Sequence, residues 1–174
     1  MQLHQYRYIG SPELQQRLKR ENHCIQVRNK SDLVSWTTSF LASGRTRGRV
    51  TATFIIDITE QLWVADRHSE HVACADSQDV LAAGEIIFDR SESQIFVAEI
   101  TNQSTGYCPE PDCWNVVARV LDRLRIQRPE FFTKAFTFRR CDKCGNTNLI
   151  KDDIYECAVC DSLLSKDWNF DVSK

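Results

Sequence analysis

The chain has 174 residues, of which 42% are hydrophobic and 26% charged, and its formal net charge is −2. No apolar run approaches the roughly 20 residues that span a bilayer, and residues 1–6 lack the basic start and apolar run of a signal peptide. We therefore expect an intracellular, cytoplasmic protein with no membrane partner. The eight cysteines do not indicate a secreted disulfide framework, and in that reducing setting paired cysteines more often bind metal.

Charge is distributed unevenly along the chain. The net charge is +5 over residues 1–59, −9 over 60–114, +6 over 115–151 and −4 over 152–174. Two arrangements are compatible with this pattern. Either the acidic middle pairs with its basic neighbours inside the fold, or the molecule has one acidic and one basic face.

The N-terminal part predicts strands alternating with helices. The expected elements are a strand at 4–9, a helix that Ser11 caps, a short strand at 24–27 and a helix from Ser31 to Gly44. The basic loop at 44–49 is expected to be a solvated connection. The alternative is a contact for phosphate or for an acidic partner.

The middle of the chain predicts strand hairpins and one further helix. The expected elements are strands at 50–58, 62–64, 80–88 and 95–100, a helix that Asp112 caps, and a strand at 136–139. This order favours an α+β fold, with a mainly antiparallel sheet and about three helices. We expect a core domain over residues 1–138. Residues 139–174 would then form a metal-binding hairpin and an aromatic tail that packs back on it or on the core.

Two cysteine pairs predict a metal site. Cys141 and Cys144 are separated by two residues, as are Cys157 and Cys160. Such spacing lets both sulfurs of a pair face one point, and four thiolates form the closed tetrahedral set of a structural zinc site. The connecting segment predicts a hairpin that turns at 151–153. The stretch 139–163 resembles the zinc ribbon family, in which a β-hairpin carries two metal-binding turns, and the expected cofactor is Zn²⁺.

A second group of polar residues allows an enzymatic alternative. His68 and Glu70 match the H-x-E half of a zinc deaminase signature, with His71 beside them. The second half of that signature, P-C-x-x-C, is not matched, because Cys108 and Cys113 are separated by four residues instead of two. In this alternative the protein is a deaminase-like or toxin-like enzyme acting on nucleotides. It would use His68, Glu70 and His71 with the loop from Ser104 to Tyr107.

Two non-enzymatic interpretations of the same region stay open. Residues 66–126 resemble the core of the plant IQ-motif calmodulin-binding proteins and related bacterial effector and toxin domains. The resemblance lies in His-Ser, then Ala-Ala-Gly-Glu, then an Asn-x-Ser stretch before Gly-Tyr. It implies a related fold, but no IQ helix is visible, so we expect no calmodulin binding. In the other interpretation the glycines serve turns, the histidines are hydrogen-bonded loop residues, and the cysteines outside the quartet are small core groups.

The basic segment suggests a binding surface near the metal site. We expect Arg123, Arg139, Arg140 and Lys143 to contact a partner, because arginine holds phosphate or carboxylate through two parallel hydrogen bonds. Two kinds of partner are compatible with this surface, a protein and a nucleic acid. The function that follows is a zinc-binding accessory or adaptor protein, with the enzyme as the alternative.

Overall fold

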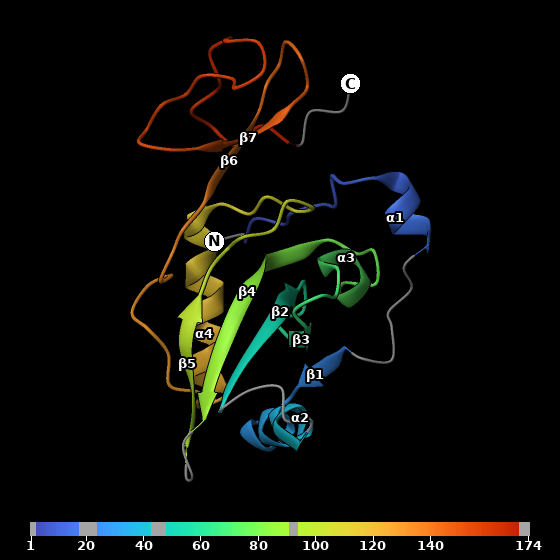
Figure 1. Cartoon of the computed structure of the whole chain (residues 1–174), viewed down its shortest axis with the longest axis vertical. Helices are drawn as coiled ribbons and strands as arrows, with labels where there is room; N and C mark the ends of the chain where they lie inside the picture. The colour runs from blue at the N-terminus through green and yellow to red at the C-terminus, as the bar shows by residue number, and fades with distance from the viewer. Residues whose placement is uncertain (1–2, 18–23, 43–47, 91–93, 171–174) are drawn as a thin grey trace.

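A five-stranded antiparallel sheet forms the centre of the molecule, in the order β1-β3-β2-β4-β5 (Figure 1). The computed structural model describes residues 3–17, 24–42, 48–90 and 94–170. The strands are β1 (Ile25–Val27), β2 (Arg49–Asp57), β3 (Leu62–Asp66), β4 (Val80–Arg90) and β5 (Ile95–Ile100). The helices are α1 (Pro12–Arg17), α2 (Lys30–Ala42), α3 (His71–Cys74) and α4 (Trp114–Arg123), with the 3-10 turn η1 (Pro111–Cys113) leading into α4. The predicted α+β class with a mainly antiparallel sheet is confirmed.

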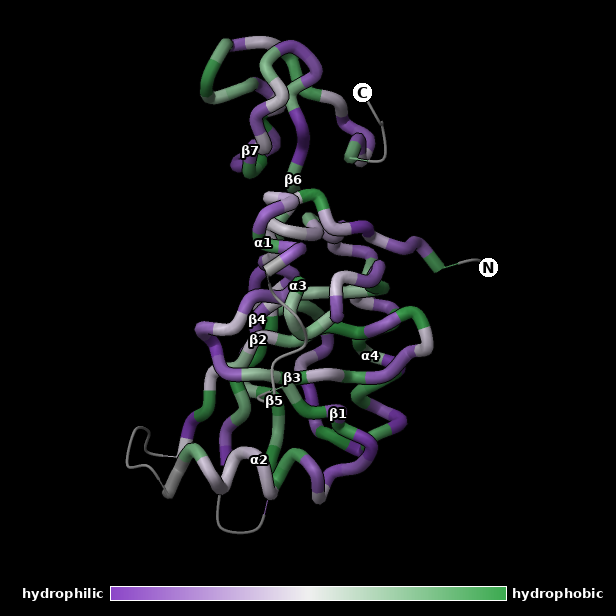
Figure 2. The backbone as a smooth tube through the Cα atoms, turned by 90° about the vertical axis from the view of Figure 1, so that its right-hand side faces the viewer, coloured by the Kyte–Doolittle hydropathy of each residue, from purple (hydrophilic) through white to green (hydrophobic). Residues whose placement is uncertain are grey.

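The sheet is covered on both faces at its centre. Residues 52–56 of β2 are buried without interruption, and successive residues of a strand point to opposite faces. Helix α4 packs on β4, whereas α3 packs on β2 and β3, and α2 lies at the β1 edge. Figure 2 shows hydrophobic stretches along the strands and further hydrophobic stretches in the C-terminal part of the chain.

Local hydrogen bonds correct two predicted boundaries. The strand expected at 4–9 is reduced to one bridge between Tyr6 and Val80, in which each N–H donates to the other's carbonyl. Helix α2 is capped by Asn29 rather than Ser31, because the Asn29 Oδ1 accepts the N–H groups of Ser31 at 2.8 Å and Asp32 at 3.1 Å. Most of the basic loop at 44–49 lies outside the described residues.

The C-terminal part forms a second, smaller unit above the sheet (Figure 1). Strands β6 (Thr137–Arg140) and β7 (Thr147–Ile150) pair antiparallel, and the chain then turns at Asp152 and Asp153, which both have positive φ. Beyond this turn the predicted hairpin continues only as isolated bridges, from Lys151 to Ile154 and from Glu156 to Leu163. We call residues 137–164 the ribbon. None of the helices in the described ranges is long and apolar enough to cross a membrane.

Candidate metal centre

Four cysteine thiols converge in the ribbon. The sulfurs of Cys141, Cys144, Cys157 and Cys160 all lie within 4.8 Å of one another. The Sγ–Sγ distance is 3.6 Å both from Cys141 to Cys160 and from Cys144 to Cys157. Four thiolates about 2.3 Å from one metal ion would lie about 3.8 Å apart at the corners of a tetrahedron. The quartet therefore has the dimensions of a closed metal site, and the predicted cysteine cluster is confirmed.

Two similar turns present the cysteine pairs. In the first turn the Gly145 N–H donates to the Cys141 carbonyl at 2.8 Å, and in the second the Asp161 N–H donates to the Cys157 carbonyl at 3.0 Å. The residue after each pair has positive φ, +77° at Gly145 and 56° at Asp161. Glycine adopts this conformation without steric cost, and aspartate is among the other residues enriched there. The repeated sequence spacing thus corresponds to a repeated backbone geometry.

A buried asparagine joins the two turns. The Asn148 Oδ1 accepts the N–H of Ala158 at 3.0 Å, and its Nδ2 lies 3.7 Å from the Cys157 sulfur. Hydrogen bonds from the backbone N–H groups of Val159 and Cys160 outweigh burial, which by itself raises the pKa, and bring the pKa of Cys157 down to about 6. A lowered thiol pKa favours the thiolate that binds a metal. The sequence around Asn148 does not predict this role, because nothing in it distinguishes Asn148 from a turn residue.

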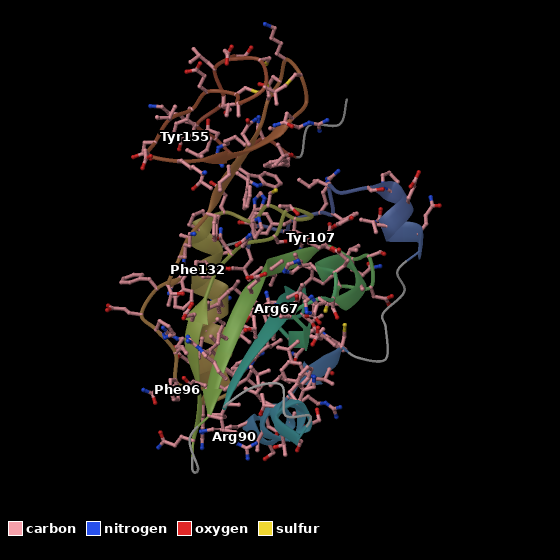
Figure 3. All side chains as sticks on the ribbon, in the orientation of Figure 1. Arg67, Arg90, Phe96, Tyr107, Phe132 and Tyr155 are labelled. Carbon is pink, nitrogen blue, oxygen red and sulfur yellow. The ribbon has the colours of Figure 1, made fainter. Side chains whose placement is uncertain are left out.

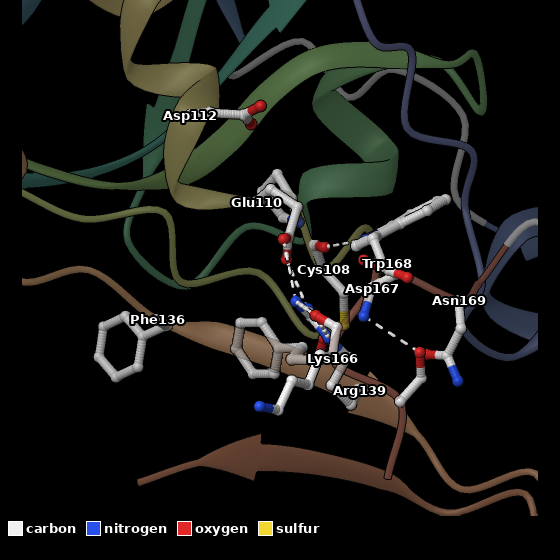
Figure 4. A network of polar contacts seen from close by, with 12 residues as sticks. Cys108, Glu110, Asp112, Phe136, Arg139, Lys166, Asp167, Trp168 and Asn169 are labelled. Carbon is white, nitrogen blue, oxygen red and sulfur yellow. Dashed lines mark hydrogen bonds and ion pairs between the residues drawn. The ribbon is translucent and has the colours of Figure 1, made fainter. Parts of the chain in front are cut away.

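Arg139 connects the ribbon to the core (Figure 4). Its guanidinium donates to both carboxylate oxygens of Glu110, at 2.6 and 3.1 Å, and to the Lys166 carbonyl at 2.7 and 3.1 Å. The residue is only 3% exposed. Arg139 was expected to contact a partner, but its charge is neutralised and its donors are used inside the molecule. It therefore acts as a junction residue.

Asn102 and Trp168 brace the same junction. The buried Asn102 side chain donates to the carbonyls of Pro109 and Phe136, at 2.8 and 2.7 Å, and accepts the Phe136 N–H at 2.7 Å. The Trp168 indole N–H donates to the Cys108 carbonyl at 2.8 Å (Figure 4). The expected return of the aromatic tail is thus confirmed, because Phe170 also packs with Cys108.

The remaining basic candidates do not gather at one surface. Arg123 lies at the end of α4 and contacts Glu60 in the β2–β3 turn, about 13.5 Å along the helix from Trp114. Arg140 is half-buried beside the junction, and Lys143 is exposed between two metal-binding cysteines. The structure therefore separates Arg123 from Arg140 and Lys143.

The acidic middle of the chain pairs with its basic neighbours. Four of the five ion pairs among the described residues join a carboxylate of 60–114 to an arginine outside it. For example, the Glu60 carboxylate accepts two hydrogen bonds from the Arg119 guanidinium, at 2.9 and 3.1 Å. The first of the two charge arrangements, matching inside the fold, therefore accounts for much of the uneven distribution.

The residues of the enzymatic alternative are engaged in different contacts. His68 and Glu70 are exposed. The Tyr107 hydroxyl donates to the Gln78 carbonyl at 3.0 Å, and its ring packs edge-on against Tyr8 with centroids 5.6 Å apart. Burial and the nearby charge of Glu70 raise the pKa of Tyr8, so the Tyr8 ring contacts the loop of Tyr107 and also lies near Glu70. Figure 3 shows Tyr107 at the sheet end that faces the ribbon.

The glycines of this region allow close backbone approach. A Cβ on Gly84 would lie 1.9 Å from the Thr101 carbonyl oxygen, and one on Gly106 would lie 2.8 Å from the Tyr8 ring. Within the described ranges, the cysteine quartet is the one group of three or more His, Cys, Asp or Glu residues placed to hold a metal. These contacts favour structural roles for the Ala-Ala-Gly-Glu and Asn-x-Ser stretches.

His71 should make stability depend on pH. Its Nε2 donates to the Gly84 carbonyl at 3.0 Å, and burial lowers its pKa from 6.5 to about 4. Between pH 6.5 and 4, His71 is protonated in the unfolded chain but stays neutral in the folded chain. The free energy of unfolding should therefore fall by roughly 3 kcal/mol over this range. Urea unfolding of His71→Gln should show a shallower fall. His68→Gln, at an exposed position, is the matched control and should keep the full slope, whereas an unchanged slope in His71→Gln would contradict the assignment.

Comparison with known proteins gives no match, whether to a family model, to a curated protein or to a solved structure. The resemblance to the IQ-motif proteins therefore has no support beyond the residues that suggested it. The functional inference rests on the geometry of the chain itself.

Proposed function

We propose that this chain is a zinc-binding adaptor that docks a protein partner through the outer face of its ribbon. The metal is assigned as zinc because four thiolates in a closed tetrahedral set are its usual structural site. The observation that carries the docking assignment is the exposure of apolar side chains. Four of the seven large hydrophobic residues exposed among the described residues lie in the ribbon.

The alternation of the extended chain places two of these side chains, Ile154 and Leu163, on one face. Lys151 is bridged to Ile154, and Glu156 is bridged to Leu163. Residues opposite each other share a face, as do residues two apart, so Lys151, Ile154, Glu156 and Leu163 all point outward. Ile154 is 61% exposed and Leu163 is 88% exposed.

The intervening residues point toward the metal site. Ile150 and Tyr155 pack against a small buried cluster formed by Cys141, Cys157 and Leu164. Since the inner positions already supply the apolar contacts of the ribbon, the outer hydrophobic side chains are not needed for its folding. A set of large apolar residues kept in water next to a metal-stabilised hairpin is typical of a protein-interaction surface.

The charge of the ribbon favours a basic protein over a nucleic acid. Residues 137–164 carry four Lys/Arg against five carboxylates, a net charge of −1, and one of these arginines, Arg139, is already paired with Glu110 in the core. Four thiolates with one Zn²⁺ add a further charge of about −2. Phosphate backbones would be repelled by this surface, whereas a partner segment with lysine or arginine around an apolar centre would be attracted.

The proposal predicts a specific loss of binding. A photo-crosslinking side chain at Leu163 should capture the partner in the native cell, and calorimetry with that purified partner should give its affinity. Ile154→Asp with Leu163→Asp should weaken binding about 100-fold, since two buried apolar anchors commonly contribute more than 1 kcal/mol each. Metal content and melting temperature should stay unchanged.

The matched control is Ile58→Asp, which alters a residue that is 51% exposed but lies outside the ribbon. This variant should bind like the wild type. Filter binding with RNA and DNA should detect no complex at physiological salt. Tight, salt-dependent nucleic-acid binding that survives both ribbon substitutions would contradict the proposal and return attention to Arg140 and Lys143.

A further inference from the structure

Two cysteines far apart in the sequence meet beside the sheet. The sulfur of Cys24, just before β1, lies 3.0 Å from the sulfur of Cys74 in α3. This is closer than the 3.6 Å pairs of the metal centre and about 1 Å longer than a disulfide bond. Cys24, one of the cysteines that the sequence suggests to be a small core group, therefore forms a pair of neighbouring thiols with Cys74.

The two thiols differ in access to solvent. Cys74 is completely buried, whereas Cys24 is half-buried and lines an open groove of about 590 Å³ between β1 and α2. Figure 1 shows these two elements at the edge of the sheet, remote from the ribbon. A groove of this size is within the range of small-ligand sites. Reagents in solution therefore reach Cys24 first.

The groove offers charged and polar groups near the accessible thiol. Arg28 and Asp32 both line the groove, and the Asp32 carboxylate accepts the backbone N–H of Arg28 at 2.9 Å. Ser31 and Ser35 add hydroxyls from α2. A peptide disulfide such as oxidised glutathione carries carboxylates and ammonium groups that match this set.

We propose that Cys24 and Cys74 form a redox-active dithiol that a low-molecular-weight peptide disulfide oxidises through the groove. The Cys24 thiolate attacks one sulfur of oxidised glutathione, and the first glutathione leaves as a thiolate that takes up a proton. The Cys74 thiolate then attacks the Cys24 sulfur and releases the second glutathione. The dithiol loses two electrons and two protons, and one oxidised glutathione becomes two reduced molecules.

The disulfide joins the β1 edge to α3. It closes a loop of about 50 residues and restricts the unfolded chain, so the melting temperature of the oxidised protein rises by about 10 °C. The metal-bound cysteines are a separate group in the ribbon, and their thiolates are held by the ion. Oxidation at moderate glutathione ratios therefore leaves the metal in place.

The test exposes the metal-loaded full chain to glutathione buffers of increasing oxidised fraction. Samples are quenched with acid, alkylated and mapped by mass spectrometry, and metal release is followed in parallel. The expected result is a peptide cross-linked from Cys24 to Cys74, while Cys108 and Cys113 react only after denaturation. Melting of the same samples reports the stability gain.

Two single substitutions establish the order of events. Cys74→Ser should accumulate one glutathione on Cys24, because the resolving thiol is missing. Cys24→Ser should leave Cys74 unmodified, because that thiol is buried. The proposal is overturned if wild-type Cys24 keeps its glutathione while Cys74 remains alkylatable, or if both thiols stay as unreactive as Cys113 until the metal is released.

Discussion

Cys157→Ser is expected to reduce the metal content from one ion per chain to near zero. The substitution removes a buried ligand whose thiolate the surrounding backbone N–H groups stabilise. Metal binding contributes about 10–16 kcal/mol to folding in small thiolate domains, so the ribbon should lose its structure with the ion. Elemental analysis of protein purified without added metal measures the first effect, and limited proteolysis within 141–164 measures the second.

The core should stay folded in that variant. Its main cluster of buried residues draws on the five-stranded sheet and α4, and the quartet cysteines do not belong to it. Cys113→Ala is the matched control, since Cys113 is buried in the core cluster and should leave the metal content at one. A wild-type content of two ions, with one lost in Cys113→Ala, would instead support the deaminase-like alternative. A wild-type content of zero would refute the metal site.

Arg139→Leu is expected to cost about 3–5 kcal/mol of unfolding free energy. Removing one partner of a buried ion pair leaves the other charge uncompensated, here the Glu110 carboxylate, and also leaves the Lys166 carbonyl without its donors. Urea unfolding of the metal-loaded protein measures the loss. Since the junction holds the ribbon on the core, the ribbon should also become more sensitive to protease while it retains its metal.

The neighbouring Arg140→Leu serves as the control. The Arg140 side chain is half-buried, and its backbone makes the contacts to Asn169, so the cost should stay within about 0.5 kcal/mol. A double-mutant cycle of Arg139→Leu with Glu110→Gln should give a coupling of at least about 1 kcal/mol. Equal costs for the two arginines, or no coupling to Glu110, would show that Arg139 does not stabilise the junction through this pair.

Local sequence determined the metal site and most of the sheet. Two residues between cysteines place both sulfurs at one tight turn, and this geometry depends on neighbours within a few residues. The hairpin of β2 with β3, and that of β4 with β5, likewise form between segments adjacent in the chain. The alternation of residues along a strand and the spacing of the metal-binding cysteines are short-range properties, so the sequence predicts them without knowledge of the fold.

Only the tertiary structure decided which polar and apolar groups face water. Arg139 and Arg140 are adjacent and chemically alike, yet only Arg139 is buried, because it pairs with Glu110, which lies 29 residues away in the sequence. Cys24 and Cys74 lie 50 residues apart and meet only because β1 reaches the sheet edge near α3. The apolar outer face of the ribbon likewise depends on bridges that place Ile154 and Leu163 on the same side. Contacts between segments distant in the sequence decide which side chains are buried and which are paired. The free energy of these contacts depends on the tertiary structure and cannot be inferred from single residues or their neighbours in the sequence.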